Sequence, residues 1–295
     1  MSFTIVLLGL LPVVSSLATP SPHARLVFMR HGQSAWNVAN LFTGWHDVEL
    51  TELGTQEATS GGMELAKAGI EFDLAFTSSL RRAQNTCAIA LKECDQVDLK
   101  VVKDWRLNER HYGALQGMDK KETVTQYGKD QVQLWRRSYD VPPPPVEEGS
   151  VYDPKADPLY ADVDPSLLPA CECLKDTVAR CLPLWHEEIA PALKDGKTVL
   201  VAAHGNSIRG LLKYLDNISE DEITGVEIPT GVPLVYDLDS ALKPLPAEGA
   251  IAPLNGCFLG DADIIAAAAA AVKAQTAVAP TDEVSDSARL QLHGM

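Results

Sequence analysis

The stretch LVFMRHGQSAWN, residues 26–37, decides the fold class. An apolar run here leads directly into Arg30, His31 and Gly32, which is typical of a buried β-strand that ends in a loop. A single histidine beside a core is ordinarily satisfied by a backbone hydrogen bond and performs no chemistry. This stretch alone therefore predicts a buried strand and leaves the role of its histidine open.

A second junction of the same kind occurs at TVLVAAHGNSIR, residues 198–209. Here an apolar run of β-type residues leads into His204, Gly205 and Asn206. In open α/β sheets the carboxyl ends of the strands line one ligand crevice, which the N-termini of helices also face. We therefore expect His31 and His204 to lie in the same crevice.

Length and composition narrow the classes of function. A chain of 295 residues with 46% hydrophobic residues can bury one sizeable core. This favours one catalytic domain with additional segments at both termini. The formal net charge of −15 argues against nucleic acid or an anionic membrane surface as a partner, because both require a basic face. Any anion-binding site must then be a local basic pocket. The six scattered cysteines lack C-x-x-C spacing, which argues against a zinc site or a disulfide scaffold.

The first 24 residues differ from the rest of the chain. FTIVLLGLLPVV, residues 3–14, is an apolar run too short for a comfortable membrane span, and small residues and prolines follow it. This favours a targeting segment over residues 1–24 and entry into the secretory route or a plastid. No Lys or Arg precedes the run, so an uncleaved tail on a cytoplasmic protein stays an alternative. We expect residues 276–295 to form a flexible C-terminal tail.

Short apolar runs alternate with helical patterns along the chain, which predicts a three-layer α/β/α domain with a mostly parallel central sheet. Strands are expected at residues 26–29, up to Thr77, within 99–105, at 198–203 and within 230–239. Helices are expected at residues 51–68, 79–94, from 174 onward, at 207–215 and at 266–276.

Prolines mark two further features. The segment 141–169 contains PPPP and repeated Asp-Pro, which excludes regular structure and predicts an excursion over the surface. In the helix that follows, Leu174, Val178 and Trp185 are expected to face the core, with a kink at Pro183.

Eight stretches in order resemble the cofactor-dependent phosphoglycerate mutases of the histidine phosphatase superfamily. They are RHGQSAWN, FTGWHDVELTELG, TSSLRRAQNT, LNERHYGALQG, WRRSYDVPPPP, ECLKDTVARCLPLW, VLVAAHGNSIRGLLKYLDNIS and IPTGVPLVYDLD. The resemblance implies a phosphoglycerate mutase-like catalytic domain over residues 25–275. It is compatible with a homodimer or homotetramer, and the sequence leaves the oligomeric state open.

The chemistry of phosphoryl transfer agrees with these residues. The transfer requires a nucleophile and a cationic cradle around the phosphoryl oxygens, and guanidinium groups can replace a metal there. The resemblance implies that His31 is the nucleophile and becomes phosphohistidine, and that Glu109 is the general acid and base. It assigns the cradle to Arg30, Arg82 and His204, whereas the neighbouring Arg81 is expected on the helix surface.

The resemblance also implies a set of substrate-binding residues. The second phosphate and the carboxylate of the substrate would bind to Arg110, Tyr112, Lys120, Arg136 and Arg137. The rest of this pocket, besides the catalytic residues, would consist of Gly32, Ser34, Asn37, Thr43, Gly44, His111, Gly205 and Asn206. No residue is predicted to bind a metal.

The expected reaction is the interconversion of 3-phosphoglycerate and 2-phosphoglycerate in glycolysis and gluconeogenesis, primed by 2,3-bisphosphoglycerate without a metal. Gln33 stands where the family commonly has glutamate, and we expect little loss of activity from it. Ser34 favours the isomerisation, because the related bisphosphoglycerate mutases usually carry glycine there. A bisphosphoglycerate mutase or phosphatase is the main alternative. A binding module without activity is disfavoured because the nucleophile and cradle are present, and a metal hydrolase because no H-E-x-x-H pair occurs.

Overall fold

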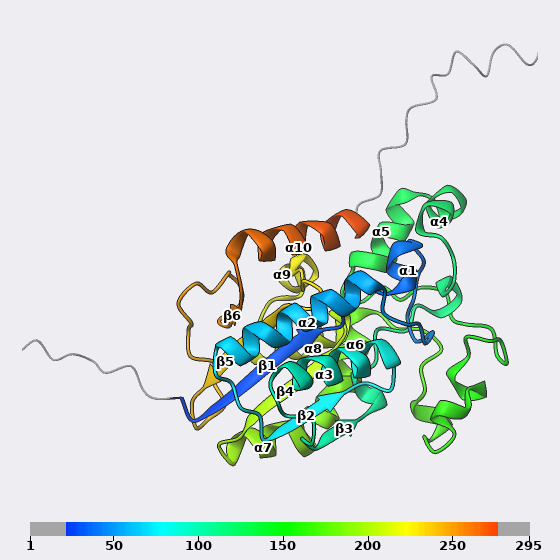
Figure 1. Ribbon diagram of the computed structural model, residues 1–295. Helices are drawn as coiled ribbons and strands as arrows, with labels where there is room; N and C mark the ends of the chain where they lie inside the picture. The colour runs from blue at the N-terminus through cyan, green and yellow to red at the C-terminus, as the bar shows by residue number, and fades with distance from the viewer. Residues whose placement is uncertain (1–21, 277–295) are drawn as a thin grey trace, which may run out of the picture.

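A six-stranded sheet of order β3-β2-β4-β1-β5-β6 forms the centre of the computed structural model, which describes residues 22–276 (Figure 1). Strands β1 to β4 run parallel, β5 pairs antiparallel with β1, and β6 pairs antiparallel with β5. The predicted α/β fold with a mostly parallel sheet is confirmed. The strands are β1 (Ala24–Arg30), β2 (Leu74–Thr77), β3 (Val101–Lys103), β4 (Thr198–Ala203), β5 (Pro233–Leu238) and β6 (Cys257–Phe258).

The register of the two central strands positions both histidine junctions. β1 and β4 are parallel neighbours in which Arg30 pairs with Ala203. The next residue of each strand is a histidine, and the His31 amide donates a hydrogen bond of 3.0 Å to the Ala203 carbonyl. Both histidines therefore leave the sheet at the same edge.

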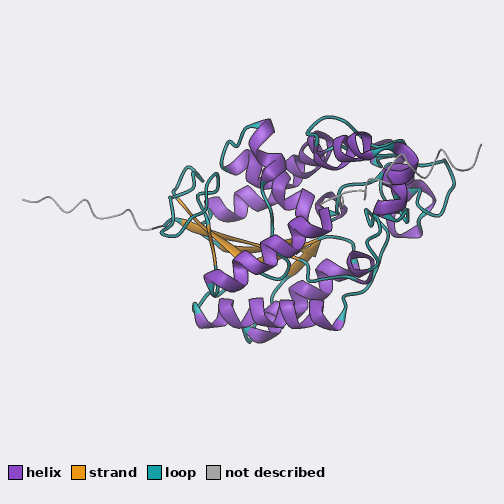
Figure 2. Ribbon diagram, turned by 90° about the horizontal axis from the view of Figure 1, so that it is seen from above, coloured by secondary structure: helices purple, strands orange, loops and turns teal. Residues whose placement is uncertain are grey.

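Helices cover both faces of the sheet (Figure 2). Because side chains alternate along a strand, Leu26 and Phe28 of β1 pack on one side and Val27 and Met29 on the other. The first side is covered by α6 (Leu174–Leu184), α7 (Ala190–Lys194) and α8 (Gly205–Leu215), and the second by α2 (Glu52–Lys67) and α3 (Arg81–Glu93). Each fully buried side chain of this size stabilises the fold by about 1.5–3 kcal/mol.

The expected helices are present, and their ends differ by a few residues. Thr51 caps α2 and accepts a 3.0 Å hydrogen bond from the amide of Gly54. Helix α3 begins two residues later than expected, α8 two residues earlier, and α10 (Ala262–Thr276) four residues earlier.

The helix predicted from residue 174 changes its hydrogen bonding after its proline. Leu174, Val178 and Trp185 are buried, as expected. Directly after Pro183 and the last residue of α6, residues Trp185–Ile189 form a π-helical turn, which continues into α7. Proline has no N–H group to donate to the preceding turn, so an irregularity in this position is the expected response.

Two helices over residues 120–137 were not predicted. Helix α4 (Lys120–Tyr127) begins at Asp119, whose carboxylate accepts from two backbone amides, and Gly128 with φ of +83° separates it from α5 (Lys129–Arg137). The pair packs against the sheet domain through a small cluster of its own: Phe42, Leu115, Val124, Val132 and Trp135. The short helices α1 (Ala35–Val38) and α9 (Glu220–Gly225) and strand β6 were also not predicted.

The proline-rich segment 141–169 contains no α-helix or β-strand, as predicted. It forms three single 3₁₀ turns, each preceded by an aspartate that accepts a backbone hydrogen bond: Pro154–Ala156, Pro158–Tyr160 and Pro165–Leu167. Tyr160 and Leu168 are buried against Trp45 and anchor the excursion to the domain.

The predicted terminal segments fall largely outside the described residues. Positions 1–21 of the expected targeting segment and 277–295 of the expected tail are not described, and β1 begins at Ala24, within the former. Between residues 22 and 276, no helix is long and apolar enough to cross a membrane.

Candidate active site

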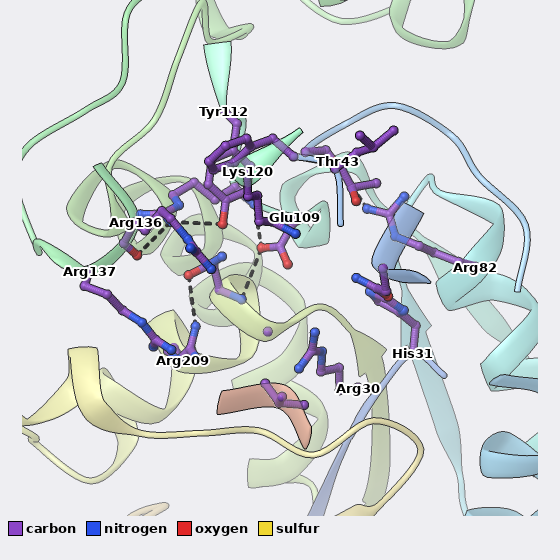
Figure 3. A pocket seen from close by; sticks show the side chains of 18 residues that line it. Arg30, His31, Thr43, Arg82, Glu109, Tyr112, Lys120, Arg136, Arg137 and Arg209 are labelled. Carbon is purple, nitrogen blue, oxygen red and sulfur yellow. Dashed lines mark hydrogen bonds between the residues drawn. The ribbon is translucent and has the colours of Figure 1, made fainter. Parts of the chain in front are cut away.

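A basic cavity opens at the sheet edge where β1 and β4 end (Figure 3). Seven of the side chains that line it are arginine or lysine, and one, Glu109, is acidic. A local excess of positive charge thus exists in a chain with a net charge of −15. The lining residues are Arg30, His31, Asn37, Leu41, Phe42, Thr43, Gly44, Arg82, Glu109, Arg110, Tyr112, Lys120, Arg136, Arg137, Gly205, Asn206, Arg209 and Val272.

His31 is held in one tautomer by its own loop. Its Nδ1 lies 2.7 Å from the carbonyl oxygen of Gly32, and because a carbonyl can only accept, Nδ1 carries the hydrogen. Burial holds the pKa of His31 well below its usual value, and the charges of Arg82 and Arg30 lower it further. At neutral pH the ring is therefore uncharged, with the lone pair on Nε2, as a nucleophile requires.

His204 caps the start of α8 beside His31. The centroids of the two rings are 4.9 Å apart, and His204 Nε2 lies 2.8 Å from the Ser78 hydroxyl oxygen. Its Nδ1 is buried and has no hydrogen-bond partner among residues 22–276. His204 itself is fully buried and is not among the residues that line the cavity.

Arg30 and Arg82 are buried guanidinium groups fixed by backbone carbonyls. Arg30 donates to the carbonyl of Ile228 at 2.8 Å, and Arg82 donates to those of Gly44 and His46 at 2.8 and 2.9 Å. Burial lowers the pKa of Arg82 to about 10, so it stays charged at neutral pH. In the described part of the chain, Nε of both groups lacks an acceptor.

The neighbouring Arg81 has a different environment. Its side chain is exposed and pairs with Asp47 and Glu49 at 2.8 and 2.6 Å, whereas Arg82 is 1% exposed and lines the cavity. The structure thus gives the two adjacent arginines different environments, as the family resemblance implied.

Glu109 is an ionised carboxylate in this environment. Burial alone would raise its pKa, but hydrogen bonds from the amides of Arg110 and Asn206 and the charges of Arg30 and Arg82 hold the pKa below its usual value. Both amides donate to Oε1, at 2.8 and 3.1 Å. Among residues 22–276, no donor to Oε2 is present, so this oxygen is available to a ligand in the cavity.

A second basic cluster, defined here as Arg110, Lys120 and Arg136, lies across the cavity from His31. Lys120 is the first residue of α4, and Arg136 lies near the end of α5. Burial, followed by the charges of Arg136 and Arg30, lowers the pKa of Lys120 to about 8. Arg110 donates to the Tyr112 hydroxyl at 3.0 Å. The cavity can thus bind two anionic groups at once.

Arg137 and Arg209 both line the cavity, and both form ion pairs with the carboxylate of Glu227. Arg137 lies 2.7 Å and Arg209 3.2 Å from oxygens of Glu227. Arg209 was not predicted as a site residue. Its position four residues after Gly205 places it on the same side of α8, a spacing that could have revealed it.

Four of the predicted site residues do not line the cavity: His204, described above, and Ser34, His111 and Gly32. Ser34 caps α1 and bonds to Asn37, and the ring of His111 bonds to the backbone of Tyr152 and Gly113. Gly32 packs against Gly54 so closely that a Cβ would lie 2.1 Å from the Gly54 carbonyl oxygen. These residues shape the loops around the site. Gln33 bonds through its side chain to Thr51 and is also absent from the lining.

Comparison with known proteins agrees with this geometry. Residues 26–239 match the family described as the histidine phosphatase superfamily (branch 1). The chain belongs to the histidine phosphatase superfamily. The match covers both histidine junctions and most of the residues that line the cavity.

Solved structures of other proteins share the fold of this histidine phosphatase. A mycobacterial glucosyl-3-phosphoglycerate phosphatase in complex with VO3 has a TM-score of 0.57 at 24% identity, covering 75% of this chain and 96% of the other. A phosphoglycerate mutase from Bacillus anthracis has a TM-score of 0.52 at 21% identity, covering 86% and 97%. At these identities the likeness extends to the fold alone, and the neighbours include both mutases and phosphatases.

Proposed function

We propose that this histidine phosphatase is a 2,3-bisphosphoglycerate-dependent phosphoglycerate mutase that interconverts 3- and 2-phosphoglycerate. The observation that carries the proposal is the presence of two separate basic groups in one cavity. Arg30 and Arg82 beside His31 suit the phosphoryl group in transfer, and the second basic cluster suits the carboxylate or the other phosphate. No metal is invoked, because guanidinium groups supply the positive charge.

The proposed reaction begins with His31 phosphorylated by the bisphosphate. The 2-hydroxyl oxygen of 3-phosphoglycerate attacks the phosphorus, the Nε2–P bond breaks, and Glu109 takes the hydroxyl proton. The resulting 2,3-bisphosphoglycerate turns in the cavity. His31 Nε2 then attacks the 3-phosphate, the P–O bond breaks, and Glu109 returns its proton to the leaving oxygen. The product is 2-phosphoglycerate, and the phosphoenzyme is restored.

The charge of Glu109 supports this order of events. The mutase cycle starts from a phosphoenzyme in which Glu109 must be a base, and its lowered pKa provides the carboxylate. The priming of His31 by the bisphosphate and the first step of a phosphatase both start from free His31, and both need an acid for the leaving oxygen. The charge of Glu109 therefore does not separate the two candidate functions.

A phosphatase remains the second candidate, because the same phosphohistidine can pass its phosphoryl group to water. The specific observation in its favour is the fold shared with a glucosyl-3-phosphoglycerate phosphatase. The outcome depends on how well water is excluded. Val272 of α10 contributes an apolar side chain to the lining, which favours exclusion.

The test is a coupled assay of 3-phosphoglycerate turnover with 2,3-bisphosphoglycerate titrated from zero, with phosphate release measured in parallel. The proposal expects isomerisation that depends on the bisphosphate and exceeds phosphate release. Turnover unaffected by rigorous removal of the bisphosphate would contradict it, and phosphate release faster than isomerisation would support the phosphatase.

A further inference from the structure

The loop that carries Glu109 is buried but lies outside the sheet. Glu109, Arg110 and His111 are at most 9% exposed, and they follow a single 3₁₀ turn at Trp105–Leu107. Buried backbone carbonyls need hydrogen-bond donors, and neither a sheet nor a long helix supplies them here. The donors must come from side chains of another element.

One guanidinium on α6 supplies most of these donors. Arg180 Nη1 donates to the carbonyls of Trp105 and Arg106 at 3.2 and 2.9 Å. Arg180 Nη2 donates to the carbonyls of Asn108 and Glu109 at 3.2 and 3.1 Å. Four carbonyls of the loop, including that of Glu109, thus accept from one side chain.

Glu172 holds Arg180 and the far side of the loop. Its carboxylate accepts from Arg180 Nε and Nη2 at 2.6 and 2.9 Å, and it accepts from the amide of His111 at 2.8 Å. The side chains of Arg180 and Glu172 are only 6% and 3% exposed. The pair therefore bonds to the backbone on both sides of the Glu109 side chain.

Trp45 completes the support. The Arg180 guanidinium carbon lies 5.2 Å from a ring centroid of Trp45, and the indole N–H donates to the carbonyl of Glu109. Trp45 directly follows Gly44, which binds Arg82 through its carbonyl. The same contacts therefore fix Glu109 relative to Arg82, which lines the cavity beside His31.

We propose that Arg180 and Glu172 are positioning residues for the proton transfer by Glu109, neither of them touching the substrate. The proposal rests on the proposed function, in which Glu109 moves the proton of the sugar-acid hydroxyl. A misplacement of about 1 Å at a reacting group can cost about 100-fold in rate, so loosening this loop should act on kcat.

Stability alone is a poor reason for such a pair. A buried ion pair contributes little net stability compared with apolar residues of similar volume, because both charges lose their hydration. A positioning role predicts a catalytic defect beyond the loss of stability, and this separates the two explanations.

The pH profile provides a second readout. Loosening the loop weakens the bonds from the Arg110 and Asn206 amides to Glu109, which raises the pKa of the carboxylate and moves the acidic limb of kcat/KM to higher pH. Charged or titratable groups that act on Glu109 come from β1, α3, α6, α8 and its own loop: the arginines Arg30, Arg82, Arg180, Arg209 and Arg110, and the phenol of Tyr112.

The experiment compares Arg180→Lys with wild type in the full chain. Lysine keeps the charge beside Glu172 but cannot reach four carbonyls with a planar fork. We expect kcat to fall about 10- to 100-fold, with KM within about threefold and the acidic limb at higher pH. Glu172→Gln is the second variant. It should also lower kcat and move the acidic limb to higher pH, and it is measured if Arg180→Lys does not fold.

The control is Tyr236→Phe, which removes another buried hydrogen bond, from the Tyr236 hydroxyl to Asp216 at the far end of α8. It should lower the melting temperature and leave kcat of the folded protein unchanged. A folded Arg180→Lys or Glu172→Gln with the kcat and pH profile of wild type would overturn the proposal, as would a rise in KM alone.

The two proposals fail in different ways. If wild type shows no bisphosphate-dependent isomerisation, the proposed function fails, and the same comparison is made on phosphate release, where Glu109 protonates the leaving oxygen. If wild type isomerises and Glu109→Gln is impaired while both pair variants are normal, the positioning role alone fails.

Discussion

The two basic groups of the cavity are built on different parts of the molecule. Arg30, Arg82 and His31 lie at the ends of β1 and the start of α3, which belong to the main cores of the sheet. Lys120 and Arg136 lie on α4 and α5, which pack through a small separate cluster. In the proposed reaction, the sheet would therefore hold the group in transfer, whereas the α4–α5 pair would bind the rest of the substrate.

The sharpest way to break this comparison is to remove the nucleophile. His31→Ala should abolish acid-labile phosphate incorporation and lower kcat at least about 10,000-fold, because no second nucleophile replaces Nε2. The measurement is isotope labelling together with the coupled assay. His186→Ala, at an exposed ring, serves as the matched control and should label normally. Normal labelling of His31→Ala would refute the assignment.

The next largest effect should come from the proton-transfer residue. Glu109→Gln keeps the shape of the side chain but cannot accept a proton, so kcat should fall about 100- to 10,000-fold with little change in KM. Steady-state kinetics of the variant decide the matter. A variant with more than a tenth of the wild-type kcat would show that another group moves the proton.

The second basic cluster should affect binding rather than chemistry. Lys120→Met removes one charge-assisted contact, worth about 1.5–3 kcal/mol, so KM for 3-phosphoglycerate should rise about 10- to 150-fold while His31 is still phosphorylated. Lys121→Met, at the exposed neighbour, is the control. If KM rises and the rate of His31 phosphorylation falls by the same factor, the two basic groups of the cavity do not act separately.

The smallest effect concerns pH. Burial lowers the pKa of Lys120 to about 8, and only the protonated amine attracts an anion. As pH rises through about 8, the free enzyme should lose this charge, and kcat/KM should decline several-fold along an alkaline limb. In Lys120→Arg the limb should move to higher pH, because a guanidinium keeps its proton. A limb that does not move would assign it to another group.

The sheet and the histidine junctions were predictable because their signal is local. An apolar run followed by a polar turn identifies a strand end, and two such ends of parallel strands must share an edge. The antiparallel direction of β5 was not predictable in this way, because a run such as PLVYDL has the same apolar pattern in either direction.

The α4–α5 pair escaped prediction for the opposite reason. Residues 120–137 are mostly polar and bury few side chains, chiefly Val124, Val132 and Trp135, so the apolar periodicity of a helix is faint. Roles within the site depended on family resemblance. No composition or spacing separates Arg82 from Arg81, and only burial in the folded chain distinguishes them.

The hydrogen bond from His31 Nδ1 to the Gly32 carbonyl would also determine the isomer of the proposed covalent intermediate. With Nδ1 occupied as a donor, the phosphorus can bond only to Nε2, the ring nitrogen remote from the main chain. Alkaline digestion of the labelled protein should therefore release a single regioisomer, tele-phosphohistidine. One hydrogen bond in the loop after β1 would thus define the chemical identity of the labelled residue that a mass spectrometer or chromatograph detects.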